Sequence, residues 1–198
     1  MNPVLRDLSL VSLNGSPRHP SRTDVLVRAI GQAIADATGA DWRHMPMTEI
    51  APHVMPALRR DALGSEGEAI IADIEAADIV LIGTPVYRAS FTGALKHVFD
   101  LVDYQALRGR VAVLAATGGN RHHGLVTEHQ LRPLMSFFGM FTVPTAVYAE
   151  EVDFDSYAIR SAAILERIES VARDVGRLVG RAPYPARLHT APIEEALS

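Results

Sequence analysis

Residues 13–23, LNGSPRHPSRT, combine hydroxyl groups, positive charges, glycine and proline directly after an apolar run. The N-terminus of a helix binds phosphate because its first N–H groups and the helix dipole both favour an anion. Serine and threonine hydroxyls can donate to the same anion, arginine can bind two of its oxygens, and glycine permits close backbone approach. The segment therefore predicts a phosphate site built from Gly15, Ser16, Arg18, Ser21 and Thr23.

A structural interpretation of the same segment is also available. Ser21 or Thr23 can cap the helix that follows, while Pro17 and Pro20 shape the turn. A lone serine would favour this interpretation, but five donor residues in one turn favour the phosphate site. Neither GxGxxG nor GxxxxGK[ST] occurs here, so a mononucleotide phosphate is favoured over a dinucleotide.

Two later segments have features that suit a flat, hydrogen-bonding ring. In GTPVYRASFTGALK, Pro85 turns the chain and Tyr87 offers an aromatic face, although simple packing of a small-residue helix start explains these residues equally well. In ATGGNRHHG, the backbone N–H groups of Thr117, Gly118 and Gly119 are little obstructed by side chains. Both segments follow apolar runs, as loops at the end of buried strands do.

Other catalytic groups do not emerge from the sequence. There is no cysteine, no GxSxG and no HExxH, and the adjacent His122 and His123 point apart on extended chain, so no metal site is predicted. His129 falls within a helical pattern and is predicted to pack or to lie at an interface. With no evident acid, base or nucleophile, the pattern favours a bound cofactor that carries the chemistry itself.

Alternating apolar runs and helical periods predict the elements that position these loops. The sequence predicts strands at 8–13, 41–47, 77–84, 110–117 and 142–149, and helices at 22–38, 66–77, 91–103, 124–140 and 156–180. Pro52 and Pro56 indicate a loop, and Pro133 should kink its helix or leave a bulge. This alternation is typical of an α/β domain with a parallel sheet, here over 1–180, with a C-terminal tail at 181–198.

Composition limits the range of partners. The chain has 198 residues, 48% of them hydrophobic, with 19 basic against 23 acidic residues, which gives a net charge of −4. No basic field indicates nucleic acid, no apolar run reaches the length that spans a bilayer, and the N-terminus does not resemble a signal peptide. The absence of cysteine fits a reducing compartment, so a cytoplasmic location is expected.

Three stretches, GSPRHPSRT, GTPVYRASFTGALKHVFDLV and ATGG, resemble the NAD(P)H-dependent FMN reductases of the flavodoxin-like superfamily. They are most similar to the reductase components of two-component alkanesulfonate and methanesulfonate monooxygenase systems, and the likeness runs from about residue 8 to residue 150. The resemblance implies a doubly wound five-stranded parallel sheet in the order 2-1-3-4-5, with helices on both faces and FMN at its carboxyl edge.

The resemblance also implies roles for individual residues. Ser16, Arg18, Ser21 and Thr23 would hold the FMN phosphate; Pro85, Val86 and Tyr87 would line the isoalloxazine ring; Thr117, Gly118 and Gly119 would bond its pyrimidine edge. The helix with His129 is similar to one that carries a π-bulge at the subunit interface in some of these reductases. His129 stands where the best-known member has a tyrosine, and Pro133 matches the pattern.

In function, the resemblance implies hydride transfer from NADH or NADPH to FMN, with no side chain needed as acid or base. Reduced FMN would pass to a partner monooxygenase, and the protein would be a homodimer or homotetramer. Two alternatives remain open at this point. One is a quinone, azo or chromate reductase that retains its FMN, and the other is a flavodoxin-like electron carrier that is not an enzyme.

Overall fold

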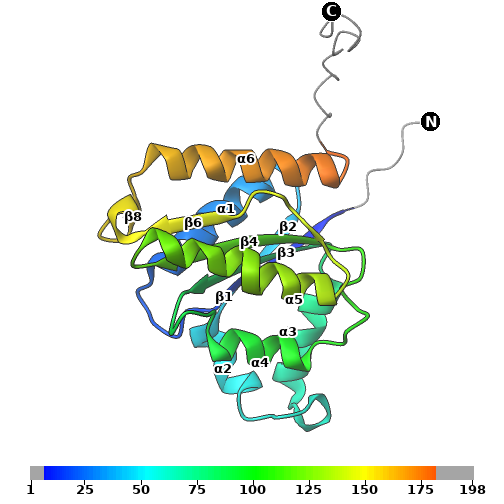
Figure 1. The fold of residues 1–198 in the computed structure, drawn as a ribbon. Helices are drawn as coiled ribbons and strands as arrows, with labels where there is room; N and C mark the ends of the chain where they lie inside the picture. The colour runs from blue at the N-terminus through cyan, green and yellow to red at the C-terminus, as the bar shows by residue number, and fades with distance from the viewer. Residues whose placement is uncertain (1–6, 182–198) are drawn as a thin grey trace, which may run out of the picture.

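The computed structural model describes residues 7–181, and a parallel sheet forms its centre (Figure 1). Its strands are β1 (Ser9–Asn14), β2 (Asp41–Pro46), β3 (Ile79–Pro85), β4 (Val111–Gly118), β5 (Phe141–Thr142) and β6 (Val147–Glu150). The order is β2-β1-β3-β4-β5, and β6 also pairs with β4. The predicted flavodoxin-like order is therefore confirmed. The predicted tail lies almost wholly outside the described residues.

The outer edge of the sheet differs from the prediction of one strand at 142–149. β5 pairs with the start of β4 at Val111 and Ala112, whereas β6 pairs with its end, from Ala115 to Gly118. After the Val143 N–H, which still donates to the Ala112 carbonyl at 2.9 Å, residues 144–146 leave the ladder, and this gap begins with Pro144, which has no N–H to donate. The edge position is thus filled by two short strands in succession.

Helices cover both faces of the sheet (Figure 1). On one face are α1 (Arg22–Thr38) and α6 (Ala162–Leu178); on the other are α2 (Met47–Val54), α3 (Ser65–Ala76), α4 (Gly93–Leu101) and α5 (Arg132–Phe137). In β3, Ile79 and Leu81 belong to the first core layer, while Val80 and Ile82 belong to the second. Burial on both faces explains why this strand is continuously apolar in sequence.

Two further predicted elements were wrong in their extent or type. Residues around Pro52 form α2 instead of a loop, because Met47, Ile50 and Val54 bury one helical face despite the proline. The predicted helix at 124–140 is divided into a 3-10 turn (Arg121–Gly124), a π-helical turn (Thr127–Leu131) and α5. The bulge expected near Pro133 is therefore present.

The last helix begins six residues later than predicted. Residues 154–159 form a short antiparallel hairpin of β7 (Phe154–Asp155) and β8 (Ala158–Ile159), and α6 starts at Ala162. Two further 3-10 turns lie at Arg60–Ala62 and Glu151–Asp153. The hairpin follows β6, so it stands at the carboxyl edge of the sheet, beside the predicted loops.

Candidate functional site

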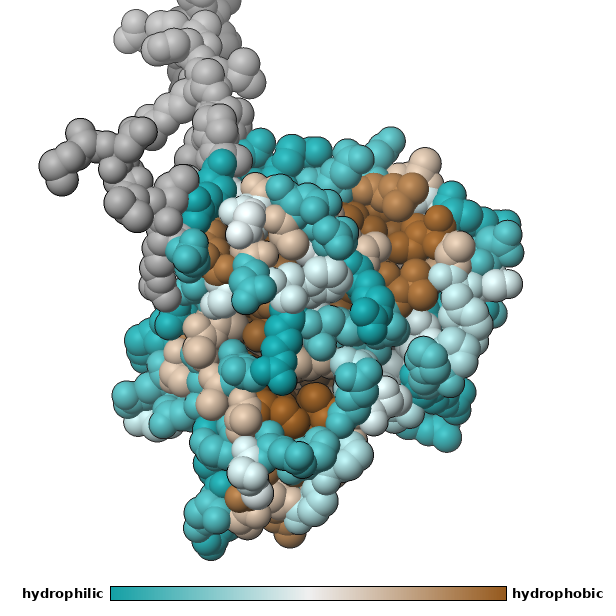
Figure 2. All heavy atoms as spheres, turned by 180° about the vertical axis from the view of Figure 1, so that it is seen from behind, coloured by the Kyte–Doolittle hydropathy of each residue, from teal (hydrophilic) through white to brown (hydrophobic). Residues whose placement is uncertain are grey.

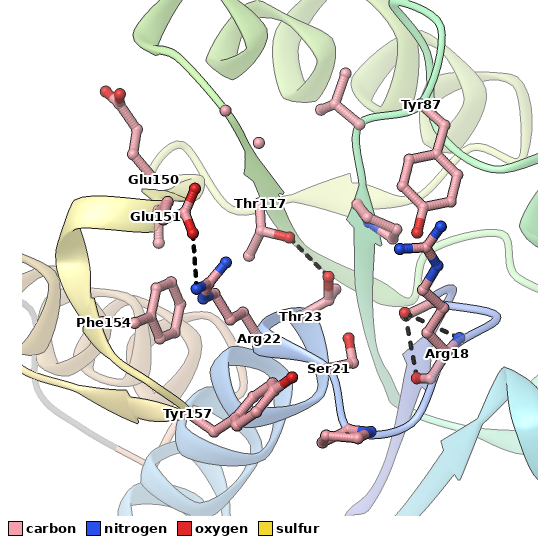
Figure 3. A pocket seen from close by; sticks show the side chains of 17 residues that line it. Arg18, Ser21, Arg22, Thr23, Tyr87, Thr117, Glu150, Glu151, Phe154 and Tyr157 are labelled. Carbon is pink, nitrogen blue, oxygen red and sulfur yellow. Dashed lines mark hydrogen bonds and ion pairs between the residues drawn. The ribbon is translucent and has the colours of Figure 1, made fainter.

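A cavity of about 310 Å³ opens at the carboxyl ends of β1, β3, β4 and β6 (Figure 3). Ten of the eleven residues predicted for a cofactor site line it. They are Ser16, Arg18, Ser21, Thr23, Pro85, Val86, Tyr87, Thr117, Gly118 and Gly119. The structure thus brings the three predicted loops together around one hollow, of the size usual for small-molecule sites, about 300–1,000 Å³.

The N-terminus of α1 lies at one end of this cavity. Ser21 is the N-cap, and its side chain accepts a hydrogen bond from the backbone N–H of Asp24. The amides of Arg22 and Thr23 begin the helix, so no intrahelical carbonyl is available to them. Ser16 is only 2% exposed, whereas the side chain of Arg18 is exposed and reaches towards Tyr87 (Figure 3).

A buried polar network supports this loop from below. His44 Nε2 lies 2.8 Å from Asp24 Oδ1, and Asn14 Nδ2 donates to the same oxygen at 2.9 Å. The carbonyl end of Asn14 accepts the Ser16 N–H at 3.0 Å. Burial raises the pKa of Asp24, but hydrogen bonds from Arg28 and His44 outweigh it and lower that pKa overall. Asp24 is therefore an ionised anchor for the loop.

The histidine of this network is held in its neutral form. Burial lowers the pKa of His44, and the hydrogen bond with Asp24 offsets only part of this effect. Trp42 Nε1 donates to Ser12 Oγ at 2.9 Å, and Ser12 Oγ lies 2.8 Å from His44 Nδ1. If neutral His44 carries its proton on Nε2, it donates to Asp24, and its Nδ1 accepts a hydrogen bond from the Ser12 hydroxyl, which in turn accepts from Trp42. Each polar group of the network then has a hydrogen-bond partner.

Gly15 is the one predicted site residue that does not line the cavity. The Gly15 N–H donates to the Gly83 carbonyl at 2.7 Å, and the Gly15 carbonyl accepts a hydrogen bond from the Thr92 hydroxyl at 2.8 Å. A Cβ at this position would lie 3.1 Å from both the Gly83 oxygen and the Leu95 side chain. Gly15 therefore lets the first loop pack against β3 and α4.

Replacing Thr92 with alanine should lower the free energy of unfolding by about 1–2 kcal/mol. Thr92 is the N-cap of α4, and its hydroxyl both accepts the Leu95 N–H and donates to Gly15. Chemical denaturation measures the effect, with Thr48→Ala at an exposed position of α2 as the control. Equal stability of the two variants would contradict the role assigned to Thr92.

Hydrogen bonds between the loops hold the cavity walls together. The hydroxyls of Thr23 and Thr117 are 2.7 Å apart, both side chains are buried, and they join α1 to the end of β4. The Val86 N–H donates to the Thr117 carbonyl at 2.8 Å, which joins the loops after β3 and β4. Thr117 is therefore the residue at which all three predicted segments meet.

The loop after β4 is fixed by Tyr148 of β6. Its hydroxyl donates to the Asn120 carbonyl at 2.5 Å. Burial, followed by the charge of Glu150, raises the pKa of Tyr148 to about 12, so it remains a donor at neutral pH. A Cβ at Gly118 would meet the Tyr148 oxygen at 2.6 Å, whereas one at Gly119 would meet no atom within 4 Å. The two glycines thus differ in role.

Part of the cavity wall was missed by the sequence analysis. Arg22, Glu150, Glu151, Phe154 and Tyr157 line the side formed by α1, β6 and the β7–β8 hairpin. The Arg22 guanidinium contacts Glu151 at 2.8 Å and donates to the Ser156 carbonyl at 3.2 Å. For the four of these residues that lie within 150–157, the signal available in the sequence was their position at or after the last strand of the sheet, because every such loop reaches the same edge.

His122, His123 and His129 lie in and after the loop that follows β4. Within residues 7–181, no cluster of three or more histidine, cysteine, aspartate or glutamate side chains could hold an ion. His122 and His129 are exposed, while His123 lies half-buried beside Gly118. Over the same residues, no helix is long and apolar enough to cross a membrane.

Comparisons with known proteins agree with this geometry. A family model described as NADPH-dependent FMN reductase matches residues 8–154. A Pseudomonas aeruginosa protein named FMN reductase (NADPH) is 43% identical over 171 residues, covering 86% of this chain and 92% of that protein. A Pseudomonas putida protein named NADH-dependent FMN reductase SfnF is 42% identical over 165 residues, covering 83% and 89%.

A solved structure with the same fold is an oxidoreductase from Corynebacterium diphtheriae. It superposes with a TM-score of 0.79 at 28% sequence identity, and the match covers 90% of this chain and all of that one. The family match spans all three loops that line the cavity, from the phosphate-type turn after β1 to the glycines after β4. The chain belongs to the NADPH-dependent FMN reductase family.

Proposed function

We propose that the cavity binds FMN and that the chain transfers hydride to it from NADH or NADPH. The observation that carries this proposal is the meeting of an anion-binding helix N-terminus with two ring-sized loops in one hollow. When bound, FMN would supply the hydride-accepting chemistry, for which the described side chains offer no substitute. Membership of the family supports flavin reduction as the reaction.

The residues at the α1 end fit the phosphate of FMN in number and kind. Ser16, Ser21 and the first amides of α1 are donors, and Arg18 can bind two phosphate oxygens with its guanidinium. Glu151 also lines the cavity, and its negative charge would repel a phosphate, but its carboxylate forms an ion pair with Arg22. The acidic charge at this side of the cavity is therefore partly balanced.

The residues at the other end fit a flat heterocycle. Tyr87 gives an aromatic surface, and the chain at Gly118 and Gly119 brings backbone close to the cavity without side chains. Backbone N–H groups there can stabilise negative charge that develops on a reduced ring, because they are fixed before the reaction. Orientation and charge stabilisation, rather than proton transfer by a side chain, are the protein's proposed contribution.

We also propose that reduced FMN leaves for a separate monooxygenase, as the sequence resemblance implies.

The assembly of the chain into a homodimer or homotetramer remains a prediction, supported by Phe137 and Phe141, whose exposed fractions are 68% and 64%. Apolar areas are visible among the polar residues on the surface in Figure 2. A cytoplasmic location also remains a prediction, supported by the absence of cysteine from the sequence.

Steady-state oxidation of NADH and NADPH, with FMN added in excess, tests the proposed function. We expect the rate to rise with FMN and to saturate, because flavin is then a substrate that exchanges. A purified protein with stoichiometric yellow colour and no response to added FMN would favour the reductase that retains its flavin. Failure to oxidise either nucleotide in the presence of bound FMN would favour the electron carrier.

A further inference from the structure

The turn Tyr87–Ser90 has a backbone conformation that its two central residues rarely adopt. Tyr87 and Ser90 exchange backbone hydrogen bonds of 2.9 and 3.1 Å, which closes a two-residue turn between them. Its central residues, Arg88 and Ala89, have φ values of 51° and 66°, as in a type I′ turn. Such turns favour Asn-Gly, because other residues are disfavoured in the left-handed region. The turn therefore needs support from outside.

That support comes from Gln130, in the π-helical turn Thr127–Leu131. Its Nε2 donates to the Ala89 carbonyl at 2.8 Å, and its Oε1 accepts a hydrogen bond from the Ser90 hydroxyl. The amide group of Gln130 thus both donates a hydrogen bond to, and accepts one from, two consecutive residues of the strained turn. The π-helical turn, a feature often found at functional sites, presents Gln130 to this turn from 40 residues away.

The same turn is tied to the cavity on its other side. The Val86 N–H donates to Thr117, and the Thr92 N–H donates to the Thr84 hydroxyl at 3.2 Å. Between these fixed points, Tyr87 is 39% exposed and lines the cavity. Its ring position consequently depends on the geometry of the turn, which Gln130 holds.

We infer that Gln130 is a positioning residue: it clamps the Tyr87–Ser90 turn and so sets where Tyr87 stands against the ring of the bound flavin. This inference rests on the proposed function for the identity of the ligand, but the clamp itself does not. The clamp acts at the ring end of the cavity, so its loss should affect flavins with and without a phosphate to the same extent.

Gln130→Ala should weaken the binding of both FMN and riboflavin about 2- to 10-fold, as expected for the loss of one or two hydrogen bonds. In the ligand-free protein, the same variant should speed hydrogen exchange of the Tyr87 and Ser90 amides. Gln32→Ala, which removes an exposed glutamine on α1 that bonds Asp36, is the matched control and should change neither quantity.

A rescue variant separates positioning from general loss of structure. Arg88→Asn with Ala89→Gly creates the Asn-Gly pair that favours this turn by itself, and it should restore flavin affinity and slow exchange in the Gln130→Ala background. Unchanged binding and exchange in Gln130→Ala, or no recovery in the rescue variant, would overturn the inference. If the wild-type protein binds no flavin, the proposed function fails, and the exchange data alone decide whether Gln130 clamps the turn.

Discussion

Replacing Arg18 with alanine should weaken FMN binding by about 1.5–3 kcal/mol, or roughly 10- to 150-fold, which is the range for a hydrogen bond to a charged group. Of the two arginines that line the cavity, Arg22 is engaged by Glu151 and the Ser156 carbonyl. Arg18 is exposed and lines the cavity, so its guanidinium is accessible to a phosphate. Titration of the variant with FMN, followed by flavin fluorescence, measures the loss.

Two comparisons make the Arg18 result specific. Arg173→Ala removes the same charge from an exposed site on α6 and should leave FMN affinity within about twofold, as expected for a distant surface charge. Riboflavin, which lacks the phosphate, should bind Arg18→Ala and the wild-type protein almost equally. In the structure the Arg18 side chain reaches towards Tyr87 (Figure 3), so equal losses for both flavins would assign it to the ring.

The layered fold could be predicted because its cause is visible in short segments of sequence. Val80 and Ile82 face one core layer and Ile79 and Leu81 the other, so β3 needs apolar residues throughout. Ser21 and Gly39 likewise mark the ends of α1, as an N-cap and as a left-handed residue with a φ of 69°. These signals depend on neighbours a few residues away.

The misjudged elements depend on contacts that are distant in sequence. Whether residues 142–149 form one strand or two is decided by pairing along β4, about 30 residues earlier, and by the gap at Pro144. Residues 156–159 were predicted to begin the last helix, but they belong to the hairpin 154–159, whose Phe154 packs into the core of α1 and α6. Local periodicity does not contain this information.

The candidate site shows the same division. Residues that point into the cavity from the loops after β1, β3 and β4 were found, because parallel strands carry their carboxyl ends to one edge. Residues that support those loops were not found. Thr92 and Gln130 act through hydrogen bonds to residues 77 and 41 positions away, and Asn14 acts by joining Ser16 to Asp24. Their types alone do not distinguish them from surface polar residues.

Gly119→Val should lower flavin affinity at least about tenfold while leaving the fold intact, as for a side chain placed in a packed binding surface. Gly119 lines the cavity, is exposed, and has an ordinary backbone conformation, and a Cβ there meets no protein atom within 4 Å. The added methyl groups would therefore extend into space at the cavity wall. Titration with FMN and with riboflavin should show similar losses, because the obstruction lies at the ring end.

The neighbouring glycine is the control that gives this prediction its meaning. A Cβ at Gly118 would lie 2.6 Å from the Tyr148 oxygen and 2.9 Å from the His123 side chain, so Gly118→Ala should disturb the loop and lower the melting temperature. Gly119→Ala should leave the melting temperature unchanged, and Gly119→Val should differ from it mainly in flavin affinity. Full affinity in Gly119→Val would mean that the flavin ring lies elsewhere, and the loop after β4 would then have to be excluded from the site.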